Sequence, residues 1–391
     1  MARHSMPAAG PPVNHAPSAL VDTEPERERV AIHGVAASSP QASIHDAAVS
    51  GLTADARVAI DRAAGDDWFR SASFAATYAV PRAERVCFLT DGRGGIADAC
   101  FYRETRRWRG LPEIHVLGRT LPAGAVIRHL TGARRPGLIH FPWLTEVEMQ
   151  TARALHPICS VRPGAEDFLI ELPSSPELYL QRLGRKTRKH LPYYLRRLQR
   201  EWGDGLEFSA RFGSGVTREL YEGLLDLNRQ RMRQRRRESG WRNGIVEQRW
   251  PIVRERGLLF GVYCREKLAA GTLSFLQGKE AYLIAIAHHP ELDALNPGSV
   301  ALWLTIQHLI GGGFRRFHLM WGEAAYKIQL GGRFEQLYTV TAFSNTALAA
   351  VWRAWDCLRI PAWMALGRKS ARRLAWEIAR MGRTESADGA Y

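Results

Sequence analysis

The sequence predicts an α/β fold of the mixed, α+β kind. Its sheets are expected to be mixed but mostly antiparallel, with helices on their flanks. Residues 257–337 read as strand, strand, strand, capped helix and strand. Residues 56–174 hold a similar mixture of short apolar runs and helical stretches. At 391 residues the chain is long enough for two domains of ordinary size. We therefore expect two successive α/β halves.

The chain carries many more basic than acidic residues. There are 54 Lys and Arg against 39 Asp and Glu, which gives a net charge of +15 and a pI of about 10.0. The hydrophobic fraction of 46% and the charged fraction of 24% are those of a globular protein. The basic surplus favours an anionic partner, whether nucleic acid, acidic lipid, anionic glycan or a phosphorylated cofactor, without choosing among them.

Cysteine usage and hydropathy favour a cytoplasmic location. The five cysteines are dispersed without C-x-x-C spacing, which argues for a reducing compartment and against a disulfide framework or zinc site. No run approaches the roughly 18 apolar residues of a membrane span, and no signal-peptide pattern is present. The pair His288–His289 has no further ligands at suitable spacing, so we expect no metal.

The first half begins after a polar leader. Residues 1–55, rich in Ala, Pro, Ser and His, are predicted to be disordered, and residues 56–174 to form a first domain. The turn Asp91–Gly95 lacks the Lys-Ser/Thr of a P-loop and so joins a β-hairpin instead of binding a nucleotide. The predicted strands of this half are 86–90, 96–102, 114–118, 138–141 and 168–172.

Residues 175–204 are predicted to be a basic helical connector. Ser175 supplies an amino-terminal cap, and Pro192 interrupts the apolar face, so we expect a kink or two helices. Eight Lys and Arg between residues 182 and 200, with no acid among them, favour an anionic ligand over a merely solvated helix face. The candidate substrate-binding residues are Arg185, Lys186, Arg188 and Tyr193.

Residues 205–345 are predicted to form the second domain. A strand at 206–211 precedes a helix at 216–237, whose last nine residues include six arginines. Short polar turns join three apolar runs, which predicts an antiparallel meander of strands at 258–264, 268–276 and 281–287. A helix at 300–310, three glycines and a strand at 314–320 follow.

The motif Asn296-Pro-Gly-Ser299 opens the helix at 300–310. A helix amino terminus presents free backbone N–H groups and a positive dipole end, which together bind phosphate. Gly298 would allow close approach of a ligand and Ser299 could donate to an oxygen. An ordinary capped helix explains the same residues, and from this motif alone it is the more frequent case.

The helix start, the glycine stop, the following strand and the sequence Gly322-Glu323…Tyr326-Lys327 together resemble the Gcn5-related N-acetyltransferase (GNAT) superfamily. They are most similar to its BioF2-like or CelD-like branch, which is related to the FemAB peptidyl transferases. The resemblance covers residues 58–345, and only its last third is specific. It implies tandem GNAT-like domains, with a basic helix at 175–204 bordering the acceptor cleft.

The resemblance also implies site residues. The acyl thioester would lie along the strand at 281–287, against Ile286 and Ala287, and the coenzyme A pyrophosphate would bind at Asn296, Gly298 and Ser299. N-acyl transfer needs a base for the amine proton and an acid for the leaving thiolate. We predict Glu323 as the base, Tyr326 as the acid, and Lys327 as a further cofactor contact. Alternatively, Glu323 and Lys327 form a plain i,i+4 ion pair.

Three functions remain open on the sequence. The first is an N-acyltransferase that uses acetyl-CoA or another acyl-CoA as co-substrate and no metal, acting on an amine. The resemblance suggests an amino sugar or nucleotide sugar in cell-surface polysaccharide synthesis. The second is a FemAB-like transferase using aminoacyl-tRNA, which the basic charge favours and the lack of an inserted coiled-coil arm disfavours. The third, a non-enzymatic nucleic-acid-binding protein, ranks last because no known nucleic-acid module is present.

Residues 346–391 are predicted to form basic amphipathic helices and a tail. Trp352 and Trp355 lie on one helical face among arginines, a composition typical of an interfacial helix on anionic lipid. This predicts peripheral contact with the inner face of a membrane. The alternative, packing of the Trp face on the second domain, is slightly favoured because the apolar stripe is narrow.

Overall fold

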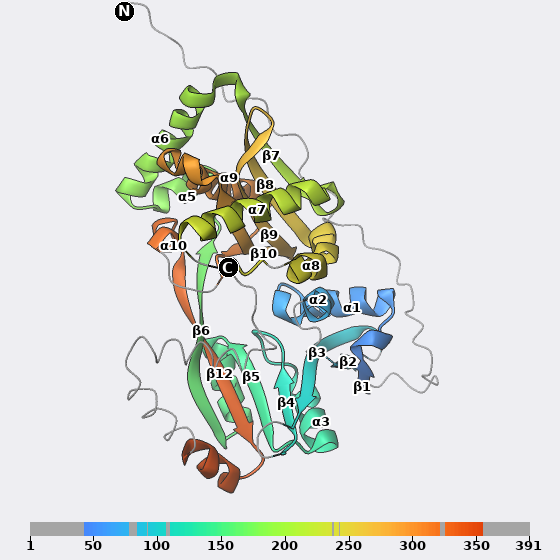
Figure 1. Ribbon diagram of the computed structural model, residues 1–391. Coiled ribbons are helices and arrows are strands. Elements are labelled where there is room, and N and C mark those ends of the chain that lie inside the picture. Colours follow the sequence, from blue (N-terminus) through green and yellow to red (C-terminus); the bar gives the residue numbers. More distant parts are fainter. Residues whose placement is uncertain are drawn as a thin grey trace, which may run out of the picture.

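The structure, a computed structural model, describes residues 43–354 except 78–83, 92, 107–109, 237, 242 and 321–324. Its strands form a 12-stranded sheet in the order β1-β2-β3-β4-β5-β12-β6-β11-β10-β9-β8-β7. Figure 1 shows two lobes, and the long strands β6 and β12 run between them. Helices flank both parts of the sheet, so the predicted mixed α/β fold is confirmed.

The first half contributes six strands to the sheet and four α-helices. The strands are β1 (Ser43–Ala48), β2 (Arg85–Thr90), β3 (Ile96–Thr105), β4 (Glu113–Val116), β5 (Leu138–Leu144) and β6 (Cys159–Glu171). The helices are α1 (Ala54–Ala64), α2 (Ala72–Thr77), α3 (Gly124–Arg134) and α4 (Glu146–Leu155). Thr53 and Thr145 cap α1 and α4 by accepting a hydrogen bond from a backbone N–H three residues on.

The second half contributes the other six strands and the longer helices. The strands are β7 (Leu206–Phe212), β8 (Gly257–Cys264), β9 (Lys267–Gln277), β10 (Glu280–His288), β11 (Arg316–His318) and β12 (Arg333–Phe343). The helices are α5 (Pro176–Arg182), α6 (Arg185–Trp202), α7 (Arg218–Gln234), α8 (Asn243–Arg256), α9 (Pro297–Gly311) and α10 (Ala325–Gln329). Short 3-10 turns join several of them: Val49–Gly51, Trp68–Arg70, Gly203–Gly205, Gly213–Gly215 and Pro290–Leu295.

Both halves have the same topology. In the first, β1, β2, β3 and β4 are antiparallel neighbours, α3 crosses over to the parallel strand β5, and β12 completes the sheet. In the second, β7, β8, β9 and β10 are antiparallel, α9 crosses over to the parallel strand β11, and β6 completes the sheet. Each half therefore receives its last strand from the other part of the sequence, and β6 and β12 pair with each other along the junction.

Helices cover both faces of the second-half sheet. Leu259, Leu273 and Tyr282 pack with α7 and α8 on one face, and their neighbours Leu258, Leu276 and Leu283 pack with α5, α6 and α9 on the other. Because both faces are buried, these strands read as continuous apolar runs. Trp68, Phe69 and Phe74 of the first half also pack into the α7–α8 core, which joins the two lobes by apolar contact.

The structure corrects several predictions. The leader prediction is wrong for residues 43–55, because β1 pairs with β2 in antiparallel register and α1 begins at Ala54. The helix break predicted at Pro192 is wrong, because α6 continues through Pro192 and the two helices of the connector are separated at Leu183 and Gly184. The strand predicted at 314–320 is paired only over Arg316–His318. The predicted borders at 174 and 205 do not separate two self-contained sheets, because β6 and β12 each complete the other half.

The predicted carboxyl-terminal helix begins as expected, and residues 346–354 are helical. Trp352 packs against Phe343 and His140 with ring centroids 5.9 and 5.8 Å apart, and the Arg162 guanidinium lies 5.6 Å from its ring. This helix therefore docks on the first-half sheet, not on the second domain. Trp355 and the remainder of the tail lie outside the described residues. No helix within the described ranges is long and apolar enough to cross a bilayer.

Candidate functional site

The parallel strands β10 and β11 separate after a short pairing. Their register covers only Glu280–Tyr282 against Arg316–His318. Beyond Tyr282, β10 runs on to His288 while β11 ends, and the register of β10 with β9 shifts at Ile284, which marks a bulge. Within the described residues, the β11 side of β10 thus has no neighbouring strand from Leu283 onward. This open edge contains the predicted cofactor residues Ile286 and Ala287, of which Ile286 is partly exposed.

The amino terminus of α9 lies at the carboxyl end of this open edge. Asn296 is the N-cap residue in the left-handed conformation (φ 56°), and its side chain makes no capping hydrogen bond. The backbone N–H of Ser299 donates a hydrogen bond to the Asn296 carbonyl. Gly298 is buried, and a Cβ there would lie 2.7 Å from His288 Nδ1. The glycine is therefore required by the approach of an imidazole, a reason that the sequence did not suggest.

His288 joins β10 to the turn before α9. Its Nε2 contacts Asp293, and its Nδ1 is buried without a hydrogen-bond partner among the described residues. Burial lowers the pKa of His288, and the nearby Arg231 and Arg235 lower it further, against the opposing effect of Asp293. The imidazole is therefore neutral near pH 7 and offers a ring nitrogen toward the start of α9.

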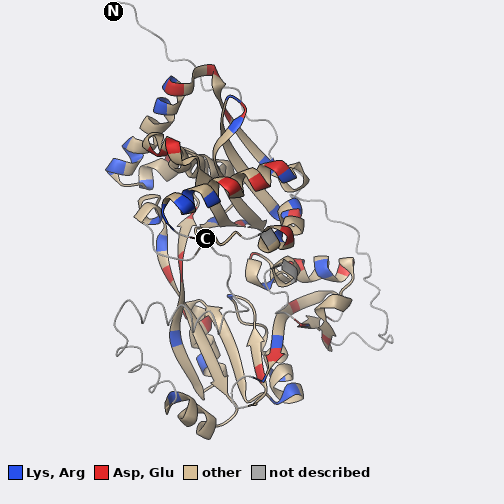
Figure 2. Cartoon of the chain, in the orientation of Figure 1, with Lys and Arg blue, Asp and Glu red and all other residues tan. Residues whose placement is uncertain are grey.

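Arginines from α7 complete the positive surroundings of this helix start. Burial and the neighbouring Arg235 lower the pKa of Arg231, whereas Tyr326 and Asp293 raise it. The Arg231 Nε atom is buried and has no hydrogen-bond partner within the described ranges. The charges on α7 change along its length, with acids mostly in the first part and only arginines after Asp226 (Figure 2). An anion bound here would accept a hydrogen bond from Arg231 Nε, which has no acceptor within the described part of the protein.

The predicted catalytic residues are only partly described. Tyr326 and Lys327 lie on α10, Tyr326 half-buried and close enough to Arg231 to interact with it electrostatically. Lys327 is buried; its Nζ donates to the Met320 carbonyl at 2.8 Å and lies 5.4 Å from the Phe168 ring. Burial lowers the pKa of Lys327 to about 8. Glu323, and with it the alternative Glu323–Lys327 ion pair, lies outside the described residues.

The basic helix α6 borders the same region. Arg197 donates to the carbonyl of Ala294, in the turn that leads into α9, at 2.9 Å. A shallow hollow of about 590 Å³ on this helix is lined by Arg188, Lys189, His190, Pro192, Tyr193 and Arg196. Two of the four predicted substrate residues, Arg188 and Tyr193, line it, and Tyr193 is 44% exposed. Arg185 and Lys186 lie on the same helix outside this lining.

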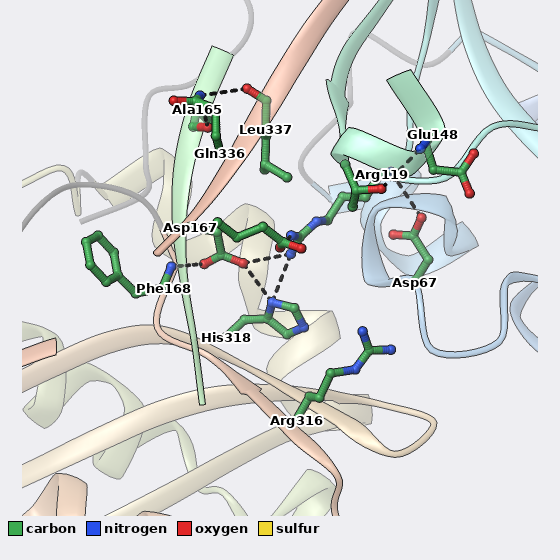
Figure 3. Close-up of polar contacts among 12 residues, drawn as sticks. Asp67, Arg119, Glu148, Ala165, Asp167, Phe168, Arg316, His318, Gln336 and Leu337 are labelled. Atoms are coloured by element: carbon green, nitrogen blue, oxygen red, sulfur yellow. Dashed lines mark hydrogen bonds and ion pairs between the residues drawn. The ribbon is translucent and has the colours of Figure 1, made fainter. Parts of the chain in front are cut away.

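A buried polar network that no sequence motif indicated joins the two halves (Figure 3). Arg119, from the segment after β4, donates to Asp167 of β6 at 2.7 Å and also contacts Glu335 of β12. His318 of β11 lies between two carboxylates, with its Nδ1 2.7 Å from Asp167 and its Nε2 2.7 Å from Glu280. The Tyr282 hydroxyl donates to Glu280 at 3.0 Å.

Ion pairing within the network keeps its side chains charged although they are buried. Burial alone would lower the pKa of His318, but Asp167 and Glu280 outweigh it and raise that pKa. Burial would likewise raise the pKa of Asp167, but His318 and Arg119 hold it well below its usual range. The two carboxylates therefore favour the imidazolium form of His318, which lies immediately before the point where β10 and β11 separate. Sequence inspection missed these residues because they come from separate elements with no common spacing.

Comparisons with known proteins agree with this architecture. Residues 185–328 match the family model described as an acetyltransferase (GNAT) domain. No curated protein matches the chain. Among solved structures, the crystal structure of FemX shares 10% identity at a TM-score of 0.56, covering 78% of this chain and 99% of that one. A conserved protein of unknown function from Bacteroides thetaiotaomicron shares 10% identity at a TM-score of 0.50, covering 75% and 98%.

A tandem GNAT protein from the clavulanic acid biosynthesis pathway is also similar, with 14% identity and a TM-score of 0.41 over 78% of this chain and 99% of that one. At these identities the solved structures show a shared fold alone. The family model covers the segment from α6 to α10, which holds the open edge of β10, the start of α9 and the α7 arginines. Residues 185–328 of this chain therefore resemble a GNAT acetyltransferase domain.

Proposed function

We propose that the protein is an acyl-CoA-dependent N-acyltransferase that transfers an acyl group directly to an amine. One observation carries the proposal. The open edge of β10 ends at a helix start where Arg231 Nε and His288 Nδ1 are buried without hydrogen-bond partners in the described structure. A diphosphate with several anionic oxygens would satisfy both groups and accept from the N–H of Gly298 at the start of α9, provided that His288 accepts a proton or the anion carries one.

The proposed binding mode follows the geometry. The pantetheine arm and thioester would extend along β10 past Ile286 and Ala287, since this strand edge can accept main-chain hydrogen bonds from an extended ligand. The pyrophosphate would lie at Asn296, Gly298 and Ser299, with Arg231 beside it. Lys327 is less suited to the predicted phosphate contact, because its Nζ is buried and donates to the Met320 carbonyl.

In the proposed reaction the acceptor nitrogen forms a bond to the thioester carbon, and the carbon–sulfur bond breaks. The amine loses one proton to a base, for which Glu323 remains the candidate, and the coenzyme A thiolate takes one proton from an acid, for which Tyr326 is the candidate. The half-buried position of Tyr326 near Arg231 fits a group that meets the cofactor. The acceptor would enter along α6, and an amino sugar or nucleotide sugar remains our candidate.

A second candidate is the FemAB-like transfer from aminoacyl-tRNA. The observation that favours it is the hollow on α6, whose lining includes three cationic side chains and the exposed Tyr193, because a stacked ring and a basic groove suit an unpaired nucleotide. Peripheral contact of the tail after residue 354 with an anionic membrane stays a prediction and is compatible with either reaction.

A ligand panel separates the two candidates. Acetyl-CoA, longer acyl-CoAs and tRNA are each added to the full chain, and melting temperature is recorded. A ligand at about 100 times its dissociation constant stabilises the protein by about 2.7 kcal/mol. We expect stabilisation by an acyl-CoA, and thiol release when amino sugars are added. Stabilisation by tRNA alone, with no thiol release, would favour the FemAB-like reaction.

Matched variants test the anion site. Arg231→Gln should weaken acetyl-CoA binding about tenfold, a loss of about 1.4 kcal/mol. Arg233→Gln is the control, since Arg233 is exposed on the same helix. Equal affinities of the two variants for acetyl-CoA would remove Arg231 from the site. Glu323→Gln should lower turnover about 10²–10⁴-fold with little change in affinity if Glu323 is the base.

A further inference from the structure

A second cluster of titratable side chains lies in the first half, away from the site described above. Glu113 and His115 are two residues apart on β4, so their side chains share one face of the sheet. β5 runs parallel to β4, and His140 is the direct register partner of His115. Strand periodicity and register therefore bring one carboxylate and two imidazoles together in the lower lobe of Figure 1.

The donor atoms of these three residues all lie within 4.8 Å of one another. The Glu113 Oε2 atom is 3.4 Å from His115 Nε2 and 3.7 Å from His140 Nε2. The two imidazole rings are stacked, with centroids 4.5 Å apart. The Thr105 hydroxyl, at the end of β3, is 3.3 Å from His115 Nε2 and 3.4 Å from Glu113 Oε2.

These separations are long for charge-assisted hydrogen bonds, which are about 2.7–2.9 Å. They match the edges of a metal coordination sphere. Nitrogen and oxygen ligands about 2.0–2.2 Å from a tetrahedral zinc ion lie about 3.4 Å from each other. Both separations between the Glu113 carboxylate and an imidazole nitrogen are therefore close to the length that a shared ion would give them.

His140 is also held in the orientation that a metal ligand needs. Its Nδ1 is 3.0 Å from the Thr341 hydroxyl on the neighbouring strand β12. When Nδ1–H donates to that hydroxyl, Nε2 presents its lone pair toward Glu113. A hydrogen bond donated by the second ring N–H is the usual support of a metal-binding histidine.

We propose that Glu113, His115 and His140 bind one divalent transition-metal ion of the zinc type. Two imidazoles and a carboxylate are the ligands that such ions favour, and three protein ligands leave a position for water or for the Thr105 hydroxyl. The Glu113 side chain is 5% exposed and that of His115 is 31% exposed, so an ion could enter past His115. The site would tie β3, β4 and β5 together and does not depend on the proposed acyl transfer.

Titration with Co²⁺ tests the proposal, because cobalt in a tetrahedral site absorbs strongly in the visible range. The full chain, stripped with EDTA, should develop this absorption with one equivalent of Co²⁺ and lose it on addition of Zn²⁺. His140→Ala and Glu113→Gln should each weaken this binding at least 100-fold. Thr341→Val should weaken it about 10–100-fold. His129→Ala on α3 is the control and should bind as the unaltered protein does.

The comparison between variants decides the outcome, because the chain has 13 histidines and other sites could take up metal weakly. Equal affinity and equal absorption for the unaltered protein and folded His140→Ala would overturn the proposal, as would the absence of tetrahedral absorption in the unaltered protein. If His140→Ala or Glu113→Gln fails to fold by circular dichroism, the more exposed His115→Gln provides the same test.

Discussion

The parallel strand pairs β4–β5 and β10–β11 occupy equivalent places in the two halves, and their residues correspond one to one. Glu113 and Glu280 begin the first strand of each pair, and His140 and His318 lie at the end of the register on the second strand. The ring that faces each histidine is His115 in one half and Tyr282 in the other. Both ring pairs are stacked, with centroids 4.5 and 4.4 Å apart.

The chemistry built on this shared framework differs. In the second half, Asp167, Arg119 and Arg316 close the cluster into a network of ion pairs, and the pKa of His318 is raised. In the first half, the neighbouring strand supplies a neutral threonine, and burial lowers the pKa of His115 to about 4. The second half thus favours a proton on His318, and the first half holds a neutral imidazole, His115, at the place of Tyr282. The difference shows how one duplicated framework can serve two purposes.

The largest expected effect concerns the acid that only the second half has. Asp167→Asn leaves Arg119 and His318 buried with one fewer counter-charge, so we expect a loss of about 3–5 kcal/mol in the free energy of unfolding. Thr341→Val, at the neutral equivalent, should cost about 1 kcal/mol. Urea denaturation measures both. Glu171→Gln is the control, because Glu171 lies on the same strand as Asp167 but forms an exposed ion pair with Arg333. This substitution should change stability by less than about 1 kcal/mol. Equal losses for Asp167→Asn and Thr341→Val would remove the proposed contrast.

The second-largest effect is expected when the Glu113–His115–His140 cluster is made to resemble its equivalent in the second half. His115→Tyr gives the first half the ring that Tyr282 provides in the second, and a phenol at this place is a poor ligand for zinc. Binding of Co²⁺ should fall about 100-fold, or about 2.7 kcal/mol. Stability without metal should change little, as measured by thermal unfolding after EDTA treatment. Retained tight Co²⁺ binding by this variant would show that His115 is not a ligand.

The crossover helices give a third contrast. Gly298→Ala places a Cβ against the buried His288, and overpacking of this kind costs about 1–3 kcal/mol. Gly124→Ala at the start of α3 meets only the end of the flexible Arg128 side chain, so we expect a change below about 1 kcal/mol. Thermal unfolding of the two variants measures the difference. A Gly298→Ala protein as stable as Gly124→Ala would mean that His288 can move aside.

The smallest expected effect is a pH dependence that belongs to the second half. The pKa of His318 is raised above its ordinary value of 6.5, so its contribution to stability is complete below pH 6.5 and is lost as pH rises through the folded pKa. Stability should therefore fall by up to about 1.4 kcal/mol per pH unit as the pH rises above 6.5 toward the folded pKa. His318→Gln should abolish this slope, and His115→Gln should leave it unchanged. A slope that persists in His318→Gln would assign it to another group.

The sequence predicted the elements of the second half well because their signals are local. The three runs from Leu258 to Ala287 are buried on both faces, and glycines or polar turns separate them. β1 was missed because its burial is only partial and its residues resemble the leader before it. The reach of β11 was overestimated because its flanks are apolar for packing reasons, as the burial of Leu319 and Met320 shows.

The candidate site was predictable only where a motif is contiguous. Asn296–Ser299 could be found as a helix start, but the need for Gly298 depends on the distant His288. Arg231 was one of six similar arginines, and only the structure distinguishes it by burial. Asp167 and Glu280 each lie just before a predicted strand and belong to no motif. The cluster of Glu113 and His115 was not predicted, because its third member, His140, is brought in by a parallel register that no local pattern reveals.

The exchange of β6 and β12 has a consequence for dissection of the protein. A cut between residues 174 and 184 gives a fragment that lacks β12, the neighbour of β5, and a second fragment that lacks β6, the neighbour of β11. Each would expose an unpaired strand edge and would aggregate or remain unfolded alone. Expressed together, the two fragments should reassemble, each donating the strand that the other lacks. The two fragments should therefore fold when they are expressed together, whereas neither should fold alone. The intact protein should unfold as one cooperative unit.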